Sequence, residues 1–122
     1  MFDEITEIRK IRKKYNQAMF RSGISTFRKF EDLEADALKD GALSRKYKEL
    51  VALGISITQK CYGWIEFHVS SAADLGATRG EILETAAVAL ALNGGPAEWP
   101  IRFVFKVLEE LQPSKDENEG KR

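Results

Sequence analysis

The chain has 122 residues, with 19 basic and 19 acidic side chains, so it is long enough for one domain, and its balanced charge argues against a nucleic-acid binder that works through net positive charge. Its single cysteine excludes an intramolecular disulfide and therefore a disulfide-stapled secreted domain. The N-terminal residues resemble no signal peptide and no apolar stretch is long enough to span a membrane, so we expect a cytoplasmic protein without a membrane partner.

The first part of the chain is predicted to form two amphipathic helices. Apolar residues at helical spacing indicate a helix over residues 2–20, and the same pattern runs through the basic stretch at 9–15, which is typical of a solvated helix face. A second helix follows, with Phe30 and Leu33 on its apolar face. Residues 39–44 are then predicted to form a loop.

The middle of the chain is predicted to form a helical hairpin. Residues 45–60 indicate a third helix that is apolar around most of its circumference, so we expect it to be largely buried. The fourth helix is predicted within residues 60–76, and Gly76 ends it. If the chain reverses near Thr58 and Gln59, these two helices pack antiparallel.

Two more helices complete the prediction. The sequence TRGE places Thr78 and Glu81 in a capping box, which begins a fifth helix over residues 79–93. After the break at NGGP, a sixth helix is predicted over residues 98–112, and Pro113 ends it.

The predicted fold class is therefore all-α, with about six helices around the central helical hairpin. We expect a single domain over residues 1–112. The remaining residues, 113–122, are polar and have no apolar surface to bury, which indicates a disordered tail.

The fourth predicted helix carries the only cysteine and the only histidine of the chain, Cys61 and His68. They share one helix face, about 10 Å apart along the axis. In the first helical turn, the free N–H groups would favour the thiolate of Cys61, and His68 can transfer protons near neutral pH. An antiparallel hairpin would set Glu49 opposite His68. The alternatives remain that Cys61 is a small buried hydrophobe, that His68 is structural and that Glu49 is solvated.

The spacing of these residues belongs to a longer pattern. A Glu is followed twelve residues later by a Cys, and a His lies seven residues beyond that Cys, before a small residue, a G-A-T segment and a Gly pair. The positions that carry it are Glu49, Cys61, Trp64, His68, Ala72, Gly76-Ala77-Thr78, Glu81-Ile82 and Gly94-Gly95. This pattern resembles the carboxymuconolactone decarboxylase family, which includes alkylhydroperoxidase D-like proteins, and the resemblance is strongest over residues 40–111. It implies an all-helical protein that assembles as a homo-oligomer, a trimer or hexamer.

The chain departs from the peroxidase-like members of the family at Trp64, where those proteins have the second cysteine of a Cys-x-x-Cys pair. The decarboxylase-like members also lack this dithiol but keep the histidine. The resemblance implies that His68 lines a pocket, and Trp64 is either a wall of that pocket or part of the core.

Three functions follow from these residues and the resemblance. The first is an antioxidant peroxidase that uses Cys61, assisted by His68 and Glu49, and an external thiol reductant. The second is a decarboxylase-like enzyme in which His68 works as acid and base on a small carboxylated lactone. The third is an oligomeric scaffold with a decayed site. We expect no cofactor, and a lone Cys and a lone His are too few ligands for a metal site.

Overall fold

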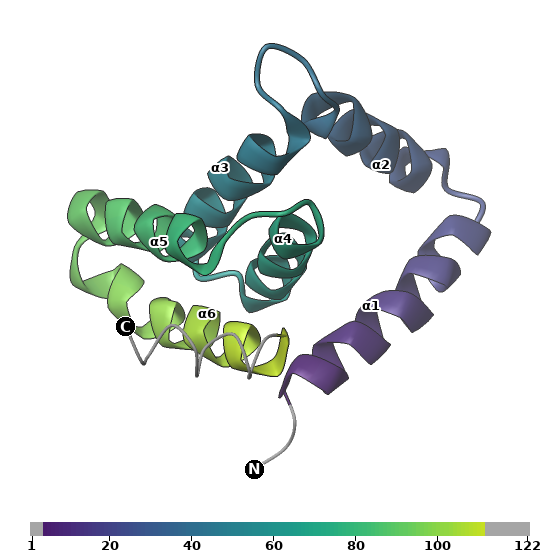
Figure 1. Cartoon of the computed structure of the whole chain (residues 1–122). Coiled ribbons are helices and arrows are strands. Elements are labelled where there is room, and N and C mark those ends of the chain that lie inside the picture. Colours follow the sequence, from purple (N-terminus) through teal and green to yellow (C-terminus); the bar gives the residue numbers. More distant parts are fainter. Residues whose placement is uncertain (1–3, 112–122) are drawn as a thin grey trace. The chain divides into compact units, whose positions relative to one another are not determined.

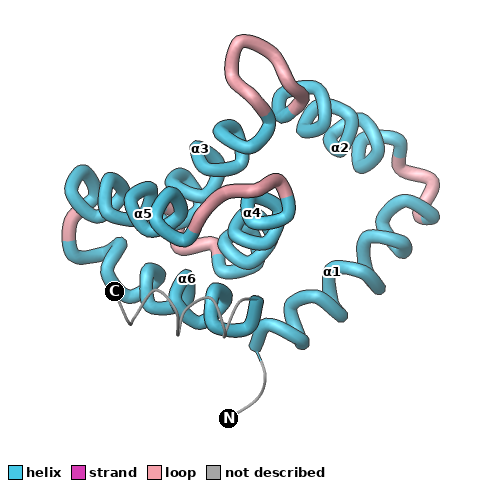
Figure 2. The backbone as a smooth tube through the Cα atoms, viewed as in Figure 1, coloured by secondary structure: helices cyan, strands magenta, loops and turns pink. Residues whose placement is uncertain are grey.

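The computed structural model describes residues 4–111, and all its regular elements in that range are helices connected by loops (Figures 1 and 2). The predicted fold class, all-α with six helices, is confirmed. The helices are α1 (Glu4–Arg21), α2 (Ser25–Leu38), α3 (Arg45–Thr58), α4 (Tyr62–Asp74), α5 (Arg79–Asn93) and α6 (Glu98–Leu111), and a short 3-10 turn, η1 (Gly95–Ala97), precedes α6. Among these residues, no helix is both long enough and apolar enough to cross a membrane.

The described chain falls into two compact units, with the boundary between Ser44 and Arg45. Helices α1 and α2 form the first unit, and helices α3 to α6 form the second. The expectation of a single domain over residues 1–112 stays a prediction. The proposed helix end at Pro113 and the proposed tail over 113–122 lie outside the described residues.

The second unit is built around α3 and α4. Helix α3 packs against α4 and α5, and α4 also packs against α6. Each helix contributes aliphatic side chains to one core, and burying such a side chain typically stabilises a fold by about 1.5–3 kcal/mol. The buried side chains of this core include Leu53, Ile57, Ile65, Val69, Ile82, Val104, Val107 and Leu108.

A three-residue turn joins α3 to α4 and creates the hairpin. Lys60 adopts a left-handed conformation with φ of 55°, and its N–H donates to the carbonyl of Ile57 at 3.0 Å. The N–H of Cys61 donates to the carbonyl of Ser56 at 3.0 Å, which completes a Schellman motif. Cys61 is also the N-cap of α4, and its carbonyl accepts from the N–H of Ile65 at 2.9 Å. One residue therefore closes α3 and opens α4, within two positions of the predicted reversal.

Lys60 occupies a position that usually belongs to glycine, because a left-handed conformation crowds any Cβ. We expect Lys60→Gly to raise the free energy of unfolding by about 0.5–1 kcal/mol, after allowance for the greater freedom of glycine in the unfolded chain. Urea denaturation measures this change. Lys60→Ala is the matched control, since it removes the same side chain but keeps the Cβ. Equal stability of the two variants would show that the backbone conformation is not the source of the cost.

The connection from α4 to α5 keeps two features predicted from the sequence. Gly76 has a φ of 95° and ends α4 in a second Schellman motif, in which the N–H of Ala77 donates to the carbonyl of Ala72 at 2.9 Å. The capping box is present: the N–H of Glu81 donates to Thr78 Oγ1 at 3.1 Å, and the N–H of Thr78 donates to Glu81 Oε1 at 2.9 Å. This backbone hydrogen bond, helped by Lys46 at 3.3 Å, lowers the pKa of Glu81.

Burial of α3 differs from the prediction. Its inner face is buried and carries Glu49, Leu53 and Ile57. Its outer face carries Val51 and Ile55, whose side chains are exposed. The expectation that α3 is largely buried is therefore wrong for the outer face, because α4 and α5 cover only part of its circumference.

Candidate functional site

A buried carboxylate and a buried imidazole meet between α3 and α4. Nδ1 of His68 lies 2.6 Å from Oε1 of Glu49. Glu49 is 0% exposed and His68 is 7% exposed, so water competes little for this hydrogen bond. The turn at Lys60 makes the contact possible, because it sets residue 49 of one helix opposite residue 68 of the next. The juxtaposition predicted from the sequence is thus present, whereas the chemical role of the pair stays a prediction.

Arg45 reaches the other oxygen of the same carboxylate. Its Nε lies 3.5 Å from Oε2 of Glu49, and its side chain is half-exposed. The two residues are four positions apart on α3, the spacing that brings side chains together on one helix face. Since an isolated buried charge is costly, the guanidinium and the imidazole together offset the desolvation of Glu49. Arg45 was not among the residues predicted from the sequence, although its four-residue spacing from Glu49 was a signal that could have identified it.

The contact with Glu49 fixes the orientation of His68. A carboxylate accepts hydrogen bonds, so Nδ1 is the donor and Nε2 is the ring nitrogen left to exchange a proton. In the neutral ring Nε2 accepts a proton, and in the charged ring it donates one. Such an arrangement is chemically suited to general acid and base catalysis.

Two aromatic side chains enclose the imidazole. The indole of Trp64 stacks on His68, with ring centroids 5.5 Å apart and planes 21° apart. Phe67 meets His68 edge to face at 5.3 Å and meets Trp64 in the same way at 5.5 Å. Trp64 is 38% exposed, so it covers His68 on one side and faces solvent on the other. Its four-residue spacing from His68 accounts for the stacking.

Cys61 occupies a different place from the one predicted. It is the N-cap residue of α4, with φ of −95° and ψ of 89°, and lies outside the first helical turn. Its side chain makes no capping hydrogen bond and is partly exposed. The prediction of a first-turn thiol is therefore wrong by one position, because the Schellman motif at Lys60 takes up the residue before it.

Glu66, on α4, is a second buried carboxylate, and it was not among the residues predicted from the sequence. It is buried, and the hydroxyl of Ser70 donates to its Oε2 at 2.7 Å. Positions 66 and 68 lie about 200° apart around the helix. Glu66 therefore faces away from the imidazole and is separate from the Glu49–His68 pair. Within residues 4–111, no group of three His, Cys, Asp or Glu side chains is placed to hold a metal ion.

Comparison with known proteins identifies the family whose sequences and structures resemble this chain. The model of the carboxymuconolactone decarboxylase family matches residues 25–110. An uncharacterized protein encoded in the cox locus of Paracoccus denitrificans is 33% identical over 91 residues, which cover 75% of this chain and 82% of that protein. An uncharacterized protein of Cupriavidus necator is 33% identical over 67 residues, which cover 55% of this chain and 59% of that protein.

Solved structures give the same result. A carboxymuconolactone decarboxylase family protein of Legionella pneumophila has a TM-score of 0.66 at 35% identity, covering 88% of this chain and 89% of that one. A family protein of Thermotoga maritima, for which a role in the antioxidative response has been suggested, has a TM-score of 0.82 at 27% identity, covering 93% of this chain and 96% of that one. The family model spans more than half of the chain and the relatives agree with it, so the chain belongs to the carboxymuconolactone decarboxylase family.

Proposed function

We propose that His68 is the general acid and base of an enzyme that acts on a small carboxylated lactone, and that Glu49 orients it. The observation that carries this proposal is the 2.6 Å contact between Nδ1 of His68 and Oε1 of Glu49 in a buried setting. A buried, oriented imidazole next to a carboxylate is the usual arrangement of a proton-transfer centre. The family supports the substrate class, since decarboxylation of a lactone is the reaction for which it is named.

The reaction needs one proton transfer that His68 can supply. The bond between the substrate carbon and its carboxylate breaks, carbon dioxide leaves, and the electron pair stays on the conjugated lactone. Protonated His68 donates the proton at Nε2 to the carbon where this pair arrives. The neutral imidazole then takes a proton from water, while Glu49 holds Nδ1 in the same orientation throughout. The test is release of carbon dioxide from carboxymuconolactone, and absence of turnover with this substrate contradicts the proposal.

A second candidate is a thiol-dependent peroxidase, a chemistry that fits the antioxidative role suggested for the Thermotoga relative. Cys61 is partly exposed at the N-cap of α4, so a hydroperoxide can approach it. The thiolate would attack the peroxide, the O–O bond would break, and an alcohol would leave with a proton from water, giving a sulfenic acid. One external thiol would then form a mixed disulfide and release water, and a second would regenerate Cys61 and leave as the oxidised disulfide.

The two candidates differ in which side chain they require. If the peroxidase is correct, Cys61→Ser abolishes consumption of tert-butyl hydroperoxide in the presence of dithiothreitol, because the sulfur is the nucleophile. Iodoacetamide should then alkylate Cys61 in the folded chain, because its thiol is partly exposed. A folded chain that resists alkylation, or that consumes peroxide equally well as Cys61→Ser, removes this candidate. Inactivity toward both substrates favours the scaffold interpretation.

A further inference from the structure

The plane of the His68 ring is not determined by the contact with Glu49 alone. The hydrogen bond from Nδ1 to Oε1 of Glu49, at 2.6 Å, selects the nitrogen that carries the proton. A carboxylate oxygen accepts over a broad range of angles, and the χ2 torsion of a histidine has broad minima, so both restrain a tilt of the ring only weakly. A tilt would move Nε2, the nitrogen that exchanges the proton. Another contact is therefore needed to fix the direction of Nε2.

The indole of Trp64 lies where it restricts such a tilt. It stacks on the imidazole with planes 21° apart and centroids 5.5 Å apart, so a tilting imidazole would meet the face of the indole. Phe67 braces both rings, because it meets His68 at 81° and Trp64 at 88°, edge to face in each case. All three side chains come from α4, so their mutual placement follows from one helix.

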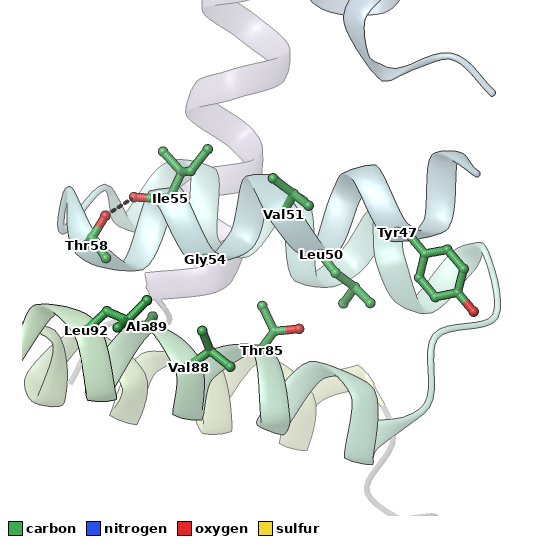
Figure 3. A pocket seen from close by; sticks show the side chains of 10 residues that line it. All are labelled: Tyr47, Leu50, Val51, Gly54, Ile55, Thr58, Thr85, Val88, Ala89 and Leu92. Carbon is green, nitrogen blue, oxygen red and sulfur yellow. Dashed lines mark hydrogen bonds between the residues drawn. The ribbon is translucent and has the colours of Figure 1, made fainter. Parts of the chain in front are cut away.

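Packing for stability alone does not explain the place of Trp64. The indole is 38% exposed, whereas Ile65 and Val69, which carry the core face of α4, are fully buried. The apolar groove between α3 and α5 is lined by neither Trp64 nor His68 (Figure 3). The indole is therefore set against the imidazole, and not against the core or the walls of the groove.

The stack suits a ring whose charge changes during a reaction. A neutral imidazole stacks on the indole as one aromatic ring on another, and a charged imidazole is attracted to the same π face as a cation. Trp is the aromatic side chain that attracts cations most strongly, and an aliphatic neighbour offers a charged ring no such attraction. The same side chain can therefore hold His68 in one plane in both protonation states.

We infer that Trp64 is a positioning residue for His68: its indole sets the plane of the imidazole and thereby the direction of Nε2, while Glu49 sets the tautomer. The consequence for catalysis rests on the proposed proton transfer by His68, but the placement of the ring can be measured without turnover. Misplacing a reacting group by about 1 Å can lower a rate about 100-fold, so a tilted imidazole would be a slow catalyst.

The first measurement follows the ring itself. His68 is the only histidine of the chain, so histidine labelled with carbon-13 and nitrogen-15 gives a single set of imidazole signals in solution NMR. Carbon-13 relaxation should show a rigid ring in the wild type and a more mobile one in Trp64→Leu, while the nitrogen-15 shifts of the neutral ring still place the proton on Nδ1. Trp99→Leu is the matched control, since it removes an indole that is 69% exposed on α6, and it should leave these signals unchanged.

The second measurement follows catalysis. Trp64→Leu should lower kcat and kcat/KM for carboxymuconolactone equally, by about 10-fold to 100-fold, because the indole acts on His68 and not on the substrate. Trp64→Phe keeps an aromatic face beside the imidazole and should recover most of the lost rate. Circular dichroism confirms that each variant is helical. If Trp64→Leu does not fold, Trp64→Met provides the same test, because its flexible side chain fills space without a fixed plane.

The outcomes separate this inference from the proposed reaction. A rigid imidazole in a folded Trp64→Leu or Trp64→Met protein overturns the inference, and so does a wild-type kcat in either variant. A change in KM alone also overturns it, because Trp64 would then contact the substrate. A mobile imidazole with the proton still on Nδ1, in a protein whose wild type does not turn over carboxymuconolactone, supports the positioning role of Trp64 and contradicts the proposed reaction only.

Discussion

Replacing His68 with Asn is expected to reduce decarboxylation of carboxymuconolactone by a factor of about 10²–10⁴, the usual contribution of a general acid or base. The amide of Asn can still donate a hydrogen bond toward Oε1 of Glu49, but it cannot exchange a proton near neutral pH. The substitution therefore keeps the buried contact and removes the chemistry. Steady-state rates of carbon dioxide release measure the effect, and an unchanged thermal midpoint shows that the fold is intact.

Glu49→Gln tests the orienting role in the same assay. The amide nitrogen of Gln can donate to Nδ1 and stabilise the wrong tautomer, so we expect a loss of similar size without a large change in substrate affinity. Cys61→Ser is the control and should keep nearly wild-type decarboxylation. A His68→Asn protein that retains the wild-type rate would show that the proton comes from another group, and the acid–base proposal would then be wrong.

Elements with local signals were predictable from the sequence. The capping box at Thr78 and Glu81 and the stop at Gly76 depend on residues within a few positions of each other, and both are present in the structure. The six helices were likewise predictable, because apolar residues recur at helical spacing along the chain. The start of α4 was placed too early, because the sequence does not show that Lys60 adopts a left-handed conformation. Non-glycine residues seldom adopt this conformation, and the residue type of Lys60 does not indicate it.

The candidate site was predictable where helix geometry alone decides the contact. Glu49 and His68 meet because two antiparallel helices with a short turn leave little freedom of register. Trp64 can stack on His68 because both lie on α4, four residues apart. The sequence does not show whether Trp64 is enclosed by other side chains or faces solvent. The predicted burial of α3 was wrong for its outer face, because a sequence shows that a helix face is apolar but does not show which elements cover it. The exposed Val51 and Ile55 are the result.

Trp64→Cys is expected to form an intramolecular disulfide with Cys61 under mild oxidation. Cys61 is the N-cap of α4 and position 64 is the third helical residue, the two positions whose groups meet in a capping box. Their Cα atoms are therefore close enough for the 4.4–6.8 Å span that is typical of a disulfide.

Trp64→Cys lowers stability by removing the indole, and the disulfide can offset part of this loss. Trp64 contacts the rings of Phe67 and His68 but is partly exposed, so its loss should lower the free energy of unfolding by about 2 kcal/mol, less than for a fully buried Trp. The closed loop is short, so the disulfide should restore only part of this loss. Denaturation with and without dithiothreitol separates the two effects.

The measurement is a count of free thiols together with the intact mass after oxidation. We expect a loss of two hydrogen atoms within one chain, reversed by dithiothreitol. Phe67→Cys is the control, because it also replaces an aromatic residue of α4 but lies six residues from Cys61, about 9 Å along the helix axis and beyond the reach of a disulfide. Two free thiols in a folded Trp64→Cys protein, or bonds only between chains, would contradict the N-cap position of Cys61. The turn at Lys60 that brings Glu49 to His68 would then need another explanation, because residues 59–61 determine both this turn and the N-cap position of Cys61.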